Sequence, residues 1–174
     1  ASYNSAFGVG SLQTNTTGTT NTAVGYQSLT ANTTAANNTA IGNQTLASNT
    51  TGAQNIAVGG RSLYTNTTTN NNTAVGYDAL YTNAASNNTA VGRDSSKANT
   101  TGTLLVSVGA YSLTANTTGI RNTAIGYESM SANTTGSHNT AVGTYALATQ
   151  TTANQNTAVG YYALKANTTA TGNV

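Results

Sequence analysis

Few side chains in this sequence could take part in catalysis or bind a metal ion. The chain of 174 residues holds three acidic residues, five basic ones, one histidine and no cysteine. Without cysteine there is no thiolate nucleophile, no disulfide and no sulfur ligand for zinc. Asp78 and Asp94 could form a carboxylate pair of the kind that glycoside hydrolysis uses, and Glu128 is the acid nearest in sequence to His138. We expect all four to be solvated, because no spacing brings a base to a nucleophile. The sequence therefore predicts no enzyme activity and no cofactor or metal site.

The charge pattern argues against nucleic acid and membrane partners. The net charge is +2, and the basic residues are scattered along the chain. Affinity for nucleic acid depends on clustered basic side chains that neutralise many phosphates. No apolar run approaches the ~18 residues that a membrane span needs, and no signal peptide is visible at the N-terminus. The five basic residues are Arg61, Arg93, Lys97, Arg121 and Lys165.

One motif recurs along the whole chain. The phrase Asn-Thr-Ala-Val-Gly returns every 17 residues, with a single interval of 16 between Gly76 and Gly92. The consensus unit is N-T-A-V-G-Y-x-A/S-L-x-A-N-T-T-G-x-x, whose positions we number as places 1 to 17. Self-similarity at a fixed short period indicates a repeat architecture rather than disorder. Residues 1–174 are therefore predicted to form one repeat domain, with units, or coils, that start at residues 4, 21, 38, 55, 72, 88, 105, 122, 139 and 156.

Two apolar places predict the core. Place 4 holds Val, Ile or Phe, and place 9 holds Leu except at Met130 and Ser96. Place 7 holds all three acids and place 10 both lysines, so we expect these two places to face water. Arg61 and Asp78 would then form a surface pair of little energetic value. The predicted core consists of Val24, Leu29, Ile41, Leu46, Val58, Leu63, Val75, Leu80, Ile125, Leu147, Val159 and Leu164.

The length and composition of the unit predict an all-β protein, a parallel β-solenoid of about ten coils. We expect Thr-Ala-Val to form one strand and Ala-Leu-x-Ala-Asn a second, with a bend at the glycine of place 5. Alternation along the first strand then puts Val inside and turns the Ala of place 3 outward. Stacked asparagines are expected to form amide ladders. Because the core is thin, the outward alanines are expected to pack against further copies in a homotrimer.

The repeated phrase resembles the repeats of two protein families. Asn-Thr-Ala-Val-Gly-Tyr, followed by Ala/Ser-Leu and Asn-Thr-Thr-Gly, is similar to repeats of phage tail-fibre-like proteins and, more distantly, of trimeric autotransporter adhesin heads. It is carried by residues 21–25, 72–76, 122–126 and 156–160 and covers nearly the whole chain, although the adhesin unit is shorter. The resemblance implies a left-handed β-roll of three chains, within a longer rigid fibre outside a cell or on a virion. Its function would be reach and surface attachment, without catalysis.

Tyrosines are the candidate contact residues. A tyrosine ring has an apolar face and a polar tip, which suits stacking on the sugars of a cell-surface glycan or on a protein receptor. The alternative is that the rings pack on a half-exposed β surface or seal a groove between chains. The candidates are Tyr26, Tyr77, Tyr111, Tyr127, Tyr145, Tyr161 and Tyr162.

Threonine favours a second function class, ice binding. Regular rows of outward Thr on a flat solenoid face could order water, with Asn of place 12 and Thr of place 14 as two parallel rows. Against this, the adjacent threonines of places 13 and 14 cannot both point outward from a straight strand. The asparagines of place 12 also begin N-x-T glycosylation motifs, which we attribute to a repeated turn. These are Asn15, Asn32, Asn49, Asn66, Asn99, Asn116, Asn133 and Asn167.

The stretch from Asn83 to Ser107 departs from the repeat. It lacks one residue and has Ser96 in place of Leu and Leu105 in place of Asn. We interpret it as a tolerated register defect, with a kink or a specialised contact band as the alternatives.

Overall fold

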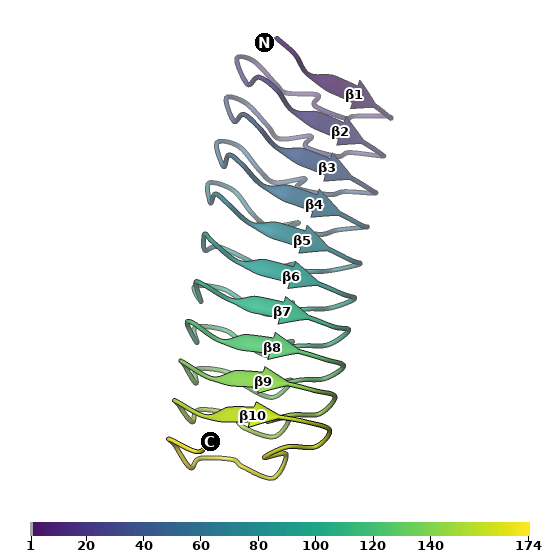
Figure 1. Cartoon of the computed structure of the whole chain (residues 1–174). Helices are drawn as coiled ribbons and strands as arrows, with labels where there is room; N and C mark the ends of the chain where they lie inside the picture. Colours follow the sequence, from purple (N-terminus) through teal and green to yellow (C-terminus); the bar gives the residue numbers. More distant parts are fainter. Residues whose placement is uncertain (1) are drawn as a thin grey trace.

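The computed structural model describes residues 2–174, and these form a parallel β-solenoid. Each coil contributes one strand of three residues, and the ten strands form a single parallel sheet in sequence order. In Figure 1 the strands lie in front and the fainter return segments behind, and the chain winds with a left-handed sense. The predicted fold class is confirmed. The strands are β1 Ser5–Phe7, β2 Thr22–Val24, β3 Thr39–Ile41, β4 Ile56–Val58, β5 Thr73–Val75, β6 Thr89–Val91, β7 Val106–Val108, β8 Thr123–Ile125, β9 Thr140–Val142 and β10 Thr157–Val159.

The register stacks each place on the same place of the next coil. Ala23 pairs with Ala40, for example, and Val24 with Ile41. The shortened coil keeps this register, because Thr73 of β5 pairs with Thr89 of β6. The missing residue is therefore absorbed in the corner between the two strands. That outcome is the tolerated defect predicted for this stretch.

The predicted second strand is absent from residues 2–174. Its leucines adopt a left-handed backbone, as at Leu29 (φ 48°) and Leu113 (φ 48°), so the segment is a series of turns. Hydrogen bonds to neighbouring coils persist, since the Leu29 amide donates to the carbonyl of Thr45 at 3.0 Å. A positive φ costs a bulky residue energy, and burial of the leucine side chain offsets that cost.

The predicted facing of the strands is wrong. The alanines of place 3, such as Ala23 and Ala74, are fully buried, and place 4 points outward. Ile41 and Ile125 are 40% and 38% exposed. The reason is the width of the coil: leucines and asparagines already fill the interior, and only a methyl group fits opposite them. The predicted core residues that lie on the outer face are Val24, Ile41, Val58, Val75, Ile125 and Val159.

The leucines of place 9 form the core as predicted. Leu29, Leu46, Leu63, Leu80 and Leu147 are completely buried, whereas Leu164, in the last coil that the structure holds, is 37% exposed.

A cluster of buried hydroxyl groups divides this core into two. One apolar cluster lies in the coils before residue 91 and the other begins at Leu105. Between them, Ser107 Oγ lies 2.8 Å from the hydroxyls of both Ser95 and Ser96. Ser95 Oγ also lies 2.9 Å from Ser112 Oγ. Ser96 in place of Leu and Ser107 in place of Ala therefore mark a polar break in an otherwise continuous apolar column, and Leu105 belongs to the second apolar cluster.

The predicted asparagine ladders are confirmed, and they lie inside the coil. Asn66 Nδ2 donates to Asn49 Oδ1 at 2.9 Å, and Asn133 Nδ2 donates to Asn116 Oδ1 at 2.9 Å. A second ladder runs along place 1, where the amide of Asn38 donates to Asn21 Oδ1 at 3.0 Å. Six asparagines of the N-x-T motifs have fully buried side chains that an enzyme could not reach in the folded chain: Asn32, Asn49, Asn66, Asn99, Asn116 and Asn133. Their burial also removes place 12 from any ice-binding surface.

Candidate functional site

The corner that follows each strand holds the candidate functional residues. Glycine at place 5 has φ between 118° and 138° and leaves no room for a side chain, since a Cβ on Gly25 would lie 2.4 Å from the carbonyl oxygen of Gly42. Place 7 is left-handed as well, with φ of 52° at Gln27 and 50° at Glu128. Places 6 and 7 therefore keep the same backbone geometry from coil to coil, whichever side chains they bear.

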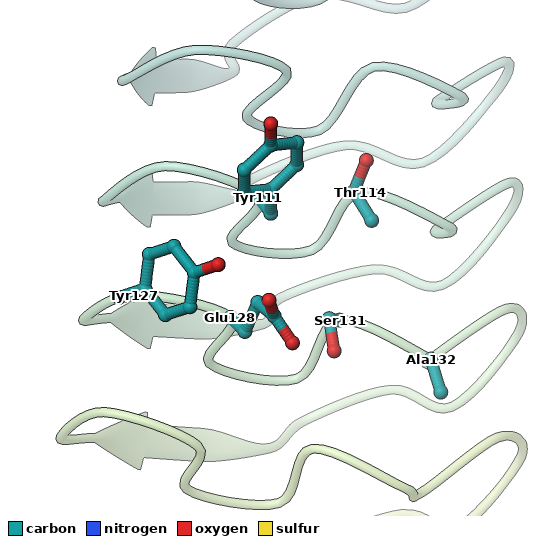
Figure 2. Close-up of a pocket in the computed structure, with 6 residues that line it drawn as sticks. All are labelled: Tyr111, Thr114, Tyr127, Glu128, Ser131 and Ala132. Carbon is teal, nitrogen blue, oxygen red and sulfur yellow. The ribbon is translucent and has the colours of Figure 1, made fainter.

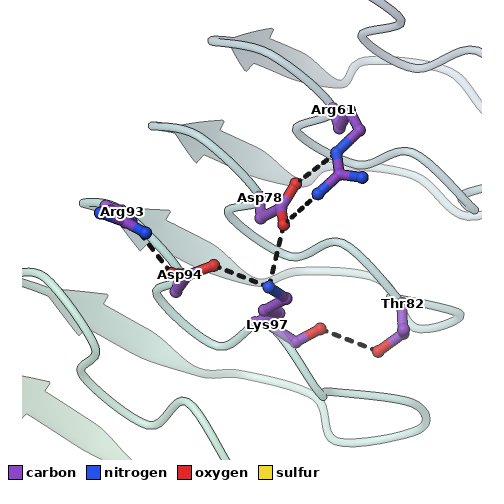
Figure 3. A network of polar contacts seen from close by, with 6 residues as sticks. All are labelled: Arg61, Asp78, Thr82, Arg93, Asp94 and Lys97. Atoms are coloured by element: carbon purple, nitrogen blue, oxygen red, sulfur yellow. Dashed lines mark hydrogen bonds and ion pairs between the residues drawn. The ribbon is translucent and has the colours of Figure 1, made fainter.

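In the middle coils this corner carries an ion network (Figure 3). Asp78 accepts two hydrogen bonds from Arg61, Nε to Oδ1 at 2.8 Å and Nη2 to Oδ2 at 2.6 Å. Lys97 Nζ lies 2.9 Å from Asp78 and 3.0 Å from Asp94. Arg93 Nε completes the network at 3.2 Å from Asp94. Both aspartates are thus neutralised by cations of their own chain.

The expectation that place 7 faces water is wrong for these two aspartates. Their side chains are 1% and 9% exposed. Burial is tolerated because each carboxylate meets at least two cationic groups. Asp78 in turn raises the pKa values of Arg61 and Lys97 above their ordinary values, chiefly by hydrogen bonding. The pair predicted as a weak surface contact is therefore part of a buried network.

Arginine also covers the tyrosines of these coils. The Arg61 guanidinium carbon lies 5.0 Å from the centre of the Tyr77 ring and 5.1 Å from that of Tyr81. Tyr81 stacks on Tyr64 with ring centres 5.2 Å apart. Tyr77, one of the predicted contact residues, is therefore engaged by an internal cation. Tyr26, another candidate, stands apart with 50% of its surface exposed.

The other five predicted tyrosines form one continuous cluster on the later coils. Tyr127 meets Tyr111 and Tyr145 edge to face, with ring centres 5.9 and 5.6 Å apart. Tyr145 stacks on Tyr162 at 5.1 Å, and Tyr161 adjoins Tyr162 at 4.1 Å. Lys165 Nζ lies 4.2 Å from the centre of the Tyr162 ring. The structure thus brings together residues that the sequence spreads over four coils.

A pocket of about 400 Å³ opens within this cluster (Figure 2). Its lining combines two aromatic rings, a carboxylate and two hydroxyl groups. A hydrogen bond to Glu128 is the main cause that raises the pKa of Tyr127 to about 12. Within residues 2–174 Glu128 forms no ion pair, unlike the two aspartates. The lining residues are Tyr111, Thr114, Tyr127, Glu128, Ser131 and Ala132.

Glu128 was not predicted to be part of a site. A signal was present, because tyrosine at place 6 followed by an acid at place 7 occurs twice, at Tyr77-Asp78 and at Tyr127-Glu128. An arginine at place 7 of the preceding coil accompanies only the first of these. His138 lies elsewhere, exposed and 3.3 Å from Arg121 Nη1.

Comparison with protein-family models, with curated proteins and with solved structures finds no match to this chain. Within the described part of the chain, no three metal-ligating side chains of His, Cys, Asp or Glu come together. Nor does any helix there have the length and apolarity to cross a membrane. The function is therefore argued from the geometry of the rod and its surface.

Proposed function

We propose that this chain is a rigid, non-catalytic segment of a fibre, located outside a cell or on a virion, that provides reach and attaches to surfaces. The observation that supports this most is the unbroken register of ten coils. Backbone pairing links every coil to the next, and two buried asparagine ladders link most of them, so bending the rod would break hydrogen bonds in a dry interior. At about 4.8 Å per coil, the rod is about 50 Å long.

Self-association is the second part of this proposal, and the outer face of the sheet is the surface that supports it. Places 2 and 4 carry β-branched residues in nearly every coil and no charged residue in any. Several of their side chains are strongly exposed, such as Ile56 (45%) and Val106 (38%). The resulting strip is uncharged, long and narrow, with an apolar row at place 4 beside a mostly threonine row at place 2, and it takes over the docking role that the sequence assigned to alanine.

The strip favours three copies rather than two. Two side-chain rows along a rod of ten coils give a flat area of about 500 Å² per chain, below the ~800 Å² per partner of a stable complex. When three rods pack around a common axis, each rod contacts two neighbours. The strip and the residues along its edges are then buried together. The partners in this proposal are therefore two further copies of the same chain.

The test is the mass of the native particle in solution. We expect three chains, and we expect Val75→Lys or Val108→Lys on the strip to give single chains, because a buried unpaired charge opposes association. Thr30→Lys is the matched control, since place 10 already holds Lys97 and Lys165 in other coils. A single chain for the unaltered protein would contradict the trimer.

Attachment is tested separately with whole cells or immobilised glycans. The exposed tyrosine cluster of the later coils supports it, and Tyr161 is 69% exposed. Replacing Tyr161 and Tyr145 by alanine is expected to reduce retention on the surface at least tenfold without changing the particle mass. Unchanged retention would show that these tyrosines do not attach the chain to surfaces.

One observation favours ice binding as a second candidate. The threonines of place 2 lie on the flat sheet, in register at the strand spacing, as with Thr22 and Thr39. This row replaces the one at places 12 and 14 that the sequence suggested. The two functions compete, because a trimer covers the face that ice would need. Inhibition of ice recrystallisation by a single-chain particle, lost in Thr73→Lys, would favour ice binding over the fibre.

A further inference from the structure

We propose that the pocket beside Tyr127 and Glu128 binds an organic ammonium ion, the protonated amine of an amino sugar. This inference names the ligand chemistry of one attachment site and in that respect rests on the function proposed above. The proposal begins from a comparison of the three acidic side chains of the chain. Asp78 and Asp94 each meet cations of the chain, whereas Glu128 meets none within residues 2–174.

The chain contains a filled version of the same site. Tyr77 and Asp78 occupy places 6 and 7 of their coil, as Tyr127 and Glu128 do, with φ of 55° at Asp78 and 50° at Glu128. In the first case the guanidinium of Arg61 pairs with the carboxylate and lies over the ring of Tyr77. Arg61 thus shows that this tyrosine–carboxylate corner accepts a cation in contact with both groups, and the ammonium group of Lys97 lies 2.9 Å from the same carboxylate.

In the second case no side chain of residues 2–174 supplies a cation to the carboxylate. The residue that corresponds to Arg61 is Tyr111, whose ring forms one wall of the open pocket (Figure 2). Arg93, the basic side chain that contacts Tyr111, is 5.7 Å from its ring centre and pairs with Asp94. Two electron-rich rings and a carboxylate that forms no ion pair within residues 2–174 attract a cation from solution, because the ring quadrupole and the charge act in the same direction.

The hydroxyl groups of the pocket favour an amino sugar over a simple amine. Thr114 and Ser131 line the side of the pocket near the carboxylate (Figure 2). Each can donate and accept a hydrogen bond, which suits the hydroxyls of a sugar ring. The pocket volume of about 400 Å³ exceeds what a lone ammonium group needs and is in the range of small-molecule sites.

The experiment is a titration of the full chain, followed by NMR shifts of the Tyr127 and Glu128 amides. Glucosamine is expected to shift them with a Kd on the order of 10 mM, and glucose is expected to bind at least tenfold more weakly.

Glu128→Gln should weaken glucosamine binding at least tenfold. This variant is expected to fold, because Tyr26-Gln27 occupies the same places with φ of 52° at Gln27. Tyr127→Ala should also weaken glucosamine binding. This variant is expected to fold, since place 6 of the preceding coil is already alanine, at Ala110. Tyr26→Ala, outside the pocket, is the control and should leave binding unchanged.

Three results would overturn the inference: glucose binding as well as glucosamine, binding that survives Glu128→Gln, or no shift at 100 mM glucosamine, on the order of ten times the expected Kd. These outcomes are separable from failure of the proposed function. A trimer that adheres to surfaces but does not bind glucosamine would contradict only the inference about the pocket. A single-chain particle that binds glucosamine contradicts only the proposed trimer.

Discussion

The corner around Asp78 and the corner around Glu128 share one backbone and differ in what completes them. In the first, Arg61 and Lys97 neutralise the carboxylate, which is buried, and Arg61 also covers the tyrosine beside it. In the second, tyrosine replaces arginine in the preceding coil, and the carboxylate lines a pocket. The same backbone conformation thus carries an ion network that links neighbouring coils in one place and an open pocket in another.

This difference shows how a repeat protein separates structure from function. The interior places repeat nearly unchanged, because each must fit its copy in the next coil. Place 7 tolerates Gln, Arg, Asp, Tyr and Glu with the same left-handed backbone. A single exchange there alters the surface chemistry without disturbing the stack.

The largest expected difference is between matched changes of acid to amide. Asp78→Asn should cost about 2–3 kcal/mol of the free energy of unfolding, because it removes the buried partner of two cations. Glu128→Gln should change it by no more than about 0.5 kcal/mol, since Glu128 forms no ion pair within residues 2–174. Denaturant unfolding of both variants provides the measurement. Equal losses would mean that the ion network adds nothing to stability.

Thermal melts at high pH should also distinguish the Asp78 corner from the Glu128 corner. Asp78 raises the pKa of Lys97 above its ordinary value of 10.5, so this contribution to stability is complete below pH 10.5 and is lost as the pH rises through the raised pKa. The difference in Tm between the unaltered chain and Lys97→Met, about a few degrees at pH 8, should therefore shrink above pH 10.5. Thr30→Met, at the same place 10 of another coil, removes no charge and is the control. A difference that stays constant with pH would contradict the prediction.

Converting one corner into the other is a direct test of the comparison. Tyr111→Arg puts arginine one coil before Glu128, as Arg61 stands before Asp78, and the backbone is compatible because φ is 59° at Tyr111 and 56° at Arg61. We expect a new ion pair worth less than about 1 kcal/mol and loss of glucosamine binding. Thermal melts and the NMR titration measure the two effects. Retained binding would show that the pocket does not depend on an unpaired carboxylate.

The smallest expected effect is a shift in one titration. The hydrogen bond to Glu128 raises the pKa of Tyr127 to about 12, so its phenol should ionise well above the ordinary value of 10.0. Glu128→Gln removes the charge and should lower the pKa of Tyr127 toward 10. The ring carbon bearing the hydroxyl reports this in an NMR titration. No change on substitution would place the carboxylate out of reach of the phenol.

Periodicity predicted some features of this molecule and not others. The glycine bend at place 5, the buried leucines and the asparagine ladders all follow from the repeat, because like residues must stack on like. The facing of Thr-Ala-Val did not follow, since alternation fixes two opposite faces but does not say which one is inside. The second predicted strand failed because Leu29 and its equivalents adopt a left-handed backbone that leucine rarely shows.

The candidate site was predictable only in part. The tyrosines were identified as contact residues, and five of them gather on the later coils. The burial of Asp78 was not foreseen, because its pair with Arg61 was predicted as a surface contact and Lys97 was not expected as a second partner. Arg61 and Lys97 are 17 and 19 residues away from it in sequence, and only the winding of the chain brings both to one carboxylate.

The sequence by itself determined the coil, its period, the positions of its bends and the stacking of identical residues, since these depend on spacing along one chain. Tertiary structure alone decided that alanine faces inward and valine outward, because the width left by leucine and asparagine is a property of the closed coil. It also decided which carboxylate is neutralised and which stays open, because a charge pairs with whatever the neighbouring coil presents within a few ångströms.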